Sequence, residues 1–147
     1  MSLTTPSGPI DPQAWVVHKF GGSSVADAQC FERVADIIES QAATLRLAIV
    51  LSACKGVTDE LLALVALAEH GHSGAHGEAP WQPRIGALRA RHAAIAEQLL
   101  QSAAAADFLA ELDRDLADLA ALLLACSVQR SATAAVRDRA AGYGEIW

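Results

Sequence analysis

The chain has 147 residues, of which 52% are hydrophobic and 19% are charged. This size and composition suit one domain with a buried core and exclude an intrinsically disordered chain. The formal net charge of −6 argues against a nucleic-acid partner or an anionic membrane surface, because either would require a basic face.

The cysteines and the chain ends give expectations about the cellular compartment and about the extent of the protein. The three cysteines are widely spaced and form no CxxC pair, which predicts reduced thiols in the cytoplasm. No apolar run approaches the roughly 18 residues of a spanning helix. Residues 1–13 lack the basic and apolar regions of a signal peptide and are predicted to be a flexible leader. At the other end, "GYGEIW" stops within an apparently structured element, so we expect a fragment of a longer protein.

The first structured segment predicts a strand, a helix and a second strand. Residues 14–20, "AWVVHKF", are apolar and are ended by two glycines, which indicates a buried strand. Asp27 is a candidate N-cap for a helix over about 27–43. The run "LRLAIVLSA", residues 45–53, predicts a second fully buried strand. Such a βαβ unit should have parallel strands and a right-handed crossover.

A second glycine loop, "SACKGVTD", follows this strand. Thr58 or Asp59 is predicted to cap the next helix. The loop after that helix contains His70, His72 and His76, which could form a metal clip. A solvated loop is favoured, because no second cluster of ligands completes the site.

The remainder of the chain is rich in alanine and leucine and predicts helices. Two apolar seams repeat at alternating steps of three and four, and their members are Leu88, His92, Ile95 and Leu99, then Leu109, Leu112, Leu116, Leu119 and Leu123. An antiparallel helical hairpin with a break at "SAAAAD" is the economical interpretation. The seams and His92 are predicted to be intramolecular core. A short helix over about 131–141 should then lead into "GYGE".

The first glycine loop, "KFGGSS", is a candidate phosphate site. Ligands of open α/β sheets bind at the carboxyl ends of strands, and a following helix can offer free N–H groups and a positive dipole end. Gly21 and Gly22 permit close backbone approach and a positive φ where needed. Lys19 supplies a mobile charge, and Ser23 and Ser24 add hydroxyl donors. The alternative is a tight turn with a solvated lysine, and neither GxxxxGK[ST] nor GxGxxG is present.

The second loop repeats this arrangement of strand end, small residues, glycine and helix. Loops from neighbouring parallel strands would face one crevice, where Ser52 and Thr58 could bind a polar ligand. The alternative is that Thr58 only caps its helix and that Ser52 is an ordinary strand-end serine. Lys55 is expected to be a solvated loop lysine.

Together these motifs resemble the N-terminal part of aspartate kinases, in the amino acid kinase superfamily. The family pattern KFGG[ST]S corresponds to residues 19–24. Residues 52–58 match a second family pattern, which consists of "SA", two variable residues, glycine, an aliphatic residue and threonine. The [ST]xGE element corresponds to residues 142–145, with Gly142 in place of the usual serine. The three motifs keep the family's order and spacing over almost the whole chain beyond the leader.

The resemblance implies an α/β fold, namely an amino acid kinase-like α/β/α sandwich with a mainly parallel sheet. Here it would be truncated to its N-terminal part and carry an inserted Ala/Leu-rich helical hairpin. Residues 14–147 would be this portion of the domain, comprising a βαβα core (14–70), a helical segment (83–141) and a GE element (142–147).

The resemblance also implies an activity for the full-length protein. It would transfer the γ-phosphoryl of ATP, bound with Mg²⁺, to the β-carboxylate of L-aspartate, the first step towards lysine, threonine and methionine. Lys19 would contact the transferring group, Gly21, Gly22 and Ser23 would line the phosphate side, and Ser52, Thr58 and Glu145 would hold aspartate. No protein metal ligands are implied, and the full-length enzyme is expected to be a homo-oligomer under feedback control.

We expect little or no kinase activity from the 147 residues alone, since the family's nucleoside pocket lies beyond "GE". Two alternatives remain open. One is another superfamily kinase acting on glutamate, acetylglutamate or a nucleoside monophosphate. The other is a noncatalytic module whose helical hairpin serves assembly.

Overall fold

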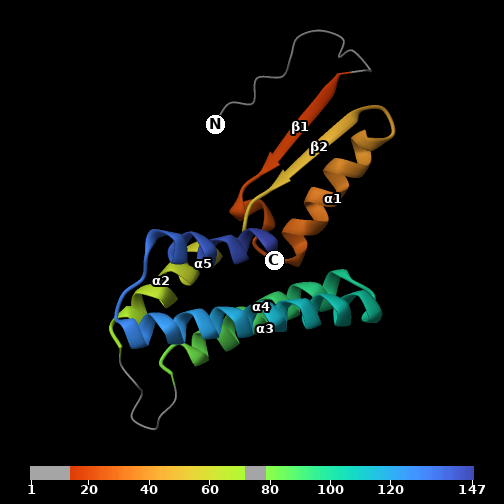
Figure 1. Cartoon of the computed structure of the whole chain (residues 1–147). Coiled ribbons are helices and arrows are strands. Elements are labelled where there is room, and N and C mark those ends of the chain that lie inside the picture. Colours follow the sequence, from red (N-terminus) through yellow and green to blue (C-terminus); the bar gives the residue numbers. More distant parts are fainter. Residues whose placement is uncertain (1–13, 72–78) are drawn as a thin grey trace.

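The computed structural model describes residues 14–71 and 79–147. Figure 1 shows a small sheet and one helix at one end of the molecule and a group of helices at the other. The elements in chain order are β1 (Trp15–Phe20), the 3₁₀ helix η1 (Gly22–Val25), α1 (Ala28–Ala42), β2 (Arg46–Leu51), α2 (Val57–Glu69), α3 (Gln82–Leu99), α4 (Ser102–Gln129) and α5 (Ala134–Ile146). The predicted α/β class with a parallel sheet and an inserted helical hairpin is confirmed.

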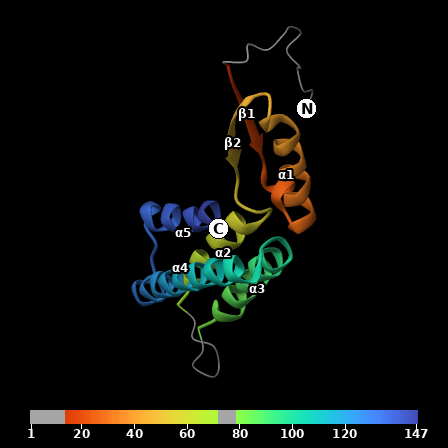
Figure 2. The same ribbon diagram turned by 90° about the vertical axis from the view of Figure 1, so that its right-hand side faces the viewer.

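The first βαβ unit forms as predicted. Strands β1 and β2 pair in parallel, in a register that runs from Trp15 opposite Arg46 to Phe20 opposite Leu51. The carboxylate of Asp27 caps α1 by accepting the backbone N–H of Cys30 at 2.8 Å. Helix α1 lies against the sheet in both views (Figures 1 and 2). The ring of His18 faces it, with Nε2 3.0 Å from Oε1 of Gln41.

The prediction that both strands are fully buried is wrong. Side chains alternate between the two faces of a sheet, and α1 covers only the face that carries His18. On the other face Trp15 is 63% exposed, Val17 is 65% exposed and Val50 is 47% exposed. The guanidinium of Arg46 lies 5.2 Å from the centroid of the Trp15 ring on that face. An apolar run therefore did not distinguish a strand covered on two faces from one covered on a single face.

Helix α2 begins earlier than predicted, and its cap is different. Gly56 precedes the helix with φ 78°, ψ −2°, and neither Thr58 nor Asp59 caps it. Thr58 lies within the first turn. Because glycine tolerates the left-handed region, the chain turns directly from the loop into the helix at Gly56.

The helical hairpin is formed by α3 and α4, which lie side by side (Figure 1). The break falls at Leu100 and Gln101, whereas the predicted break, "SAAAAD", forms the start of α4. Alanine has the highest helix propensity of all residues, which explains why this segment continues the helix rather than interrupting it. A two-residue connection then suffices to reverse the chain.

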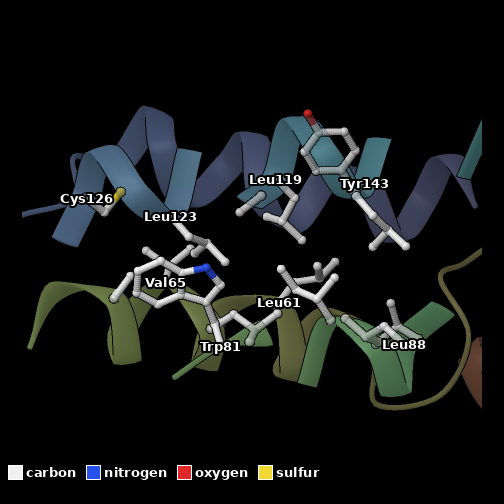
Figure 3. Close-up of a cluster of buried hydrophobic side chains, with 14 of the residues drawn as sticks. Leu61, Val65, Trp81, Leu88, Leu119, Leu123, Cys126 and Tyr143 are labelled. Atoms are coloured by element: carbon white, nitrogen blue, oxygen red, sulfur yellow. The ribbon is translucent and has the colours of Figure 1, made fainter. Parts of the chain in front are cut away.

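The helices α2 to α5 share one apolar core, part of which is drawn in Figure 3. Leu61 and Val65 of α2 pack opposite Leu119 and Leu123 of α4, and all four side chains are 0% exposed. The predicted seams are confirmed as core at Leu88, Leu112, Leu116, Leu119 and Leu123, and His92 is 3% exposed. Within the described ranges, no helix is long and apolar enough to cross a membrane.

The last helix also differs from its prediction. Residues 142–145, "GYGE", belong to α5 and do not form a separate element after it. Gly144 is buried because α5 packs closely on α2, and this contact outweighs the low helix propensity of the two glycines.

Candidate functional site

The two glycine loops meet at the carboxyl ends of the parallel strands. The backbone N–H of Ser52 donates to the carbonyl of Phe20 at 3.1 Å, which extends the pairing just beyond β2. Further along, the N–H of Lys55 donates to the carbonyl of Gly22 at 3.0 Å. The prediction that both loops lie at one edge of the sheet is confirmed.

Gly22 is required by the contact between these loops. A Cβ atom at this position would lie 2.8 Å from the carbonyl oxygen of Ala53 and 3.3 Å from the backbone of Lys55. Real Cβ atoms do not approach backbone oxygens so closely, so a side chain here would force the loops apart. Gly21 does not use the positive φ that glycine permits, since it is extended at φ −80°, ψ 170°. In the described chain, the glycines with positive φ are Gly56 and Gly71.

The ammonium of Lys19 lies near Gly21 of the first loop. Lys19 is the second-last residue of β1, its side chain is exposed, and its Nζ would be 3.6 Å from a Cβ placed on Gly21. Within the described residues the Lys19 ammonium forms no ion pair. Ser23 is exposed in η1 just beyond. The ammonium of Lys19 therefore lies close to the backbone at Gly21.

Glu145 brings the third motif to the second loop. Its Oε2 accepts the backbone N–H of Ala53 at 3.1 Å, although the two residues are 92 positions apart. The close approach of α5 depends on Gly144, where a Cβ would meet Val57, Ala53 and Leu61 at 3.1–3.3 Å. The C-terminus lies near the ends of the strands in Figure 1.

The two remaining candidates for a polar ligand belong to the second loop and the start of α2. Ser52 and Thr58 are half-buried on either side of the loop that Glu145 contacts. One oxygen of the Glu145 carboxylate is held by the loop, and Oε1 is the other acceptor. The hydrogen bonds therefore bring the Glu145 carboxylate to the second loop and the second loop to the first, at the strand ends beside Lys19.

At the N-terminus of α1, where free N–H groups were expected to favour a phosphate, the N–H of Cys30 is already bound by a side chain. The carboxylate of Asp27 occupies this position, and the N–H of Cys30 lowers the pKa of Asp27, so that it is ionised. The N-terminus of α2 has no side-chain cap but carries Asp59 and Glu60 in its first turn. Any phosphate at this site would depend on Lys19 and the loop backbone more than on a helix dipole.

Sequence reasoning missed Arg91, which contacts the second loop and the turn between η1 and α1 that follows the first loop. From α3, Nη1 donates to the carbonyl of Lys55 at 2.8 Å and Nη2 donates to the carbonyl of Ala26 at 3.0 Å. The partners are 36 and 65 residues away along the chain, and the surrounding sequence is an alanine-rich helix without a motif. No spacing rule links such positions, so the sequence carried no signal for this contact.

An apolar cavity of about 210 Å³ lies behind the second loop, lined in part by Cys54, His92 and Trp147. The Nδ1 of His92 is 2.8 Å from the carbonyl of Leu88, and because a carbonyl only accepts, Nδ1 carries the proton. Burial lowers the pKa of His92 and raises the pKa of the Cys54 thiol, so both groups are neutral. None of the predicted site residues lines this cavity.

The described residues contain no cluster of three or more histidine, cysteine, aspartate or glutamate side chains that could hold a metal ion. His70 is described, and its Nδ1 lies 2.6 Å from the carbonyl of Ala66. His72 and His76, the other members of the possible clip, lie outside the described residues.

Comparison with known proteins links this geometry to one family. Residues 14–140 match the model of the amino acid kinase family. The chain is 37% identical over 131 residues to lysine-sensitive aspartokinase 3 of Escherichia coli, covering 89% of this chain and 26% of that protein. It is 31% identical over 135 residues to the chloroplastic bifunctional aspartokinase/homoserine dehydrogenase 2 of Arabidopsis thaliana, covering 92% of this chain and 14% of that protein.

Solved structures agree with the sequence relatives. The crystal structure of E. coli aspartokinase III in complex with aspartate and ADP superposes with a TM-score of 0.71 at 32% identity, covering 90% of this chain and 26% of that chain. The complex of the same enzyme with lysine and aspartate gives a TM-score of 0.68. The chain therefore spans about a quarter or less of the length of each of these relatives.

Proposed function

This chain belongs to the amino acid kinase family, and on that premise we propose that it forms the aspartate-binding part of an aspartate kinase. The observation that carries the proposal is the convergence of three separate motifs on one pair of loops, through the Lys55–Gly22 and Ala53–Glu145 hydrogen bonds. The relatives named aspartokinase, and the complex of one such enzyme with aspartate and ADP, support the choice of substrate.

In this proposal the full-length protein transfers the γ-phosphoryl group of ATP to the β-carboxylate of L-aspartate. Phosphoryl transfer depends on in-line placement and on neutralising the phosphate oxygens, and the acceptor carboxylate is already ionised. A strong general base is therefore not needed. The carboxylate oxygen attacks phosphorus, the bond to the β,γ-bridging oxygen breaks, and ADP leaves with the electron pair.

Each side chain has a proposed role, which the family resemblance implies. The ammonium of Lys19 neutralises the transferring phosphoryl group, and the backbone at Gly21, Gly22 and Ser23 lines the phosphate side. Ser52 and Thr58 hydrogen-bond aspartate, and Glu145 pairs with its α-ammonium. Mg²⁺ is proposed to arrive with the phosphates of ATP as part of the substrate.

The proposal also covers the product, the pathway and the assembly of the full-length enzyme. The product would be 4-phospho-L-aspartate, which enters lysine, threonine and methionine biosynthesis, and the full-length enzyme would be a cytoplasmic, allosterically regulated homo-oligomer. The 147 residues alone are expected to have little or no turnover, since they span 26% or less of the E. coli and A. thaliana aspartokinase relatives.

The test is an assay of the full-length gene product with ATP, Mg²⁺ and L-aspartate, in which hydroxylamine traps the acyl phosphate as a hydroxamate. We expect aspartate-dependent hydroxamate from the wild type and a loss of at least about a hundredfold in Lys19→Ala, the usual effect of removing one electrostatic group from a transition state. Lys55→Ala, an exposed lysine of the other loop, is the matched control and should lose far less.

The outcomes are distinct. Equal losses in the two lysine variants would contradict the specific role of Lys19. A folded wild type that binds ATP but forms product only with glutamate or another acceptor would replace aspartate as the substrate. A full-length protein that binds no ATP would refute the kinase proposal.

A further inference from the structure

We propose that Arg91 is a positioning residue, which fixes the separation of the two glycine loops and thereby couples the helical hairpin to the substrate site. This inference rests on the proposed function. It concerns a residue that lies outside all three motifs and that contacts the loops only through their backbone. Because Arg91 bonds to carbonyl groups, the identities of the loop side chains gave no indication of it.

The guanidinium of Arg91 bridges two backbone carbonyl groups. One guanidinium donates to Ala26, just after η1, and to Lys55, in the loop after β2. These carbonyls belong to the two chain segments that also meet at the Lys55–Gly22 hydrogen bond. The loops are therefore joined directly by a backbone hydrogen bond and indirectly through Arg91, and movement of either loop would strain both links.

The bridge is anchored on a helix that is itself fixed. Arg84, on the same helix, forms a bidentate pair with Glu60 in the first turn of α2 at 2.6 and 2.8 Å. Leu88 of the same helix is 5% exposed and belongs to the core that also contains Leu112 and Leu116 of α4. His92, the residue next to Arg91, is buried in the core. A side chain that extends from such a helix can set the position of a loop rather than follow it.

Arginine is suited to this task and lysine is not. The guanidinium is planar and presents several N–H donors in a fixed fork, so one group can bind two carbonyls at a defined spacing. A lysine ammonium is a point charge on a flexible stem and would favour one carbonyl over the other. Hydrogen bonds from a charged donor are also stronger than neutral ones.

The separation of the two loops should control the alignment of the two substrates. The first loop follows Lys19 and is the proposed phosphate side, whereas the second is flanked by Ser52 and Thr58 and contacts Glu145 on the proposed aspartate side. A change in loop separation alters the alignment of the two substrates, on which in-line transfer depends steeply. Loss of the bridge should therefore affect kcat as well as the KM for both substrates.

The kinetic test uses the full-length protein and four forms of it: wild type, Arg91→Met, Arg91→Lys and Arg89→Met. Arg91→Met should lower kcat/KM about tenfold or more, with kcat reduced, and Arg91→Lys should recover only part of this loss. Arg89→Met removes an arginine from the same helix that contacts neither loop, and it should stay within about twofold of wild type. Equal kinetics for Arg91→Met and Arg89→Met would overturn the proposal.

Hydrogen exchange of the same proteins tests the bridge without reference to turnover. Peptides covering residues 21–27 and 52–57 should exchange faster in Arg91→Met than in wild type, while peptides of the α2–α4 core keep their protection. Unchanged exchange in both loops would overturn the bridge. If the wild type makes no aspartyl phosphate, the proposed function fails, and exchange alone then decides whether Arg91 holds the loops.

Discussion

Gly144 provides a quantitative test of how the third motif is brought to the site. Replacing it with alanine adds one methyl group between α5 and the second loop. The new Cβ would lie 3.1 Å from Cγ1 of Val57, 3.2 Å from Cβ of Ala53 and 3.3 Å from Cδ1 of Leu61. All three neighbours are buried, at 0–4% exposure, so none can turn away into solvent.

The expected magnitude is the balance of two opposing effects. Glycine to alanine in a helix interior stabilises by about 0.5–1 kcal/mol through backbone entropy and helix propensity. Overpacking a well-filled core costs about 1–3 kcal/mol. Gly142 supplies the matched control, because it lies in the same helix and a Cβ there has nothing within 4 Å. Gly142→Ala should therefore stabilise the protein, and Gly144→Ala should be about 1–3 kcal/mol less stable than Gly142→Ala.

Urea unfolding followed by tryptophan fluorescence measures this difference, since Trp81 is 4% exposed in the folded core. With an m-value of about 2 kcal/mol/M, the two midpoints should differ by about 0.5–1.5 M. If Gly144→Ala proved as stabilising as Gly142→Ala, the close packing of α5 on the second loop would be refuted. The explanation of how Glu145 reaches Ala53 would fail with it.

Two further predictions concern the first loop and the core histidine. Gly22→Ala should destabilise the protein by at least about 2 kcal/mol in urea unfolding, because its Cβ would lie 2.8 Å from a backbone oxygen. Gly21→Ala should stay within about 1 kcal/mol of wild type, and similar losses in both variants would contradict the loop contact. Because burial lowers the pKa of His92 below its usual 6.5, the unfolded chain takes up this proton at higher pH than the folded one. Stability from this group is therefore fully present above about pH 6.5 and is lost as the pH falls through the folded pKa. The midpoint in urea should drop more steeply between about pH 7 and pH 5 for wild type than for His92→Gln, and parallel curves would contradict the assignment.

Several features of the fold could be read from the sequence because they depend on neighbours a few residues apart. The Asp27 cap, the two strands and the leucine seams all follow from side-chain chemistry and periodicity within one element. The pairing of the two loops followed from them, since parallel strands bring their carboxyl ends to one edge. The motif residues were therefore identifiable from the sequence.

The errors share a different origin. The sequence pattern indicated buried strands, yet only one face of the sheet is covered in the described chain. Glycines predicted the end of a helix at "GYGE", yet Gly144 is within α5 because a close contact with α2 needs a residue without a side chain. In the first case the sequence pattern does not say which faces of a strand other segments cover. In the second case a local propensity was outweighed by packing against a distant segment.

For this protein the sequence by itself determined the order of the elements, the parallel strand pair, the apolar seams and the three motifs that mark the family. The tertiary structure alone decided that Gly22 is needed for a loop contact, that Glu145 binds Ala53 and that Arg91 bridges the two loops. The physical reason is sequence separation. A cap or a seam is set by side chains within a few positions, whereas these contacts join residues 31 to 92 positions apart, and their partners are backbone groups that every residue possesses.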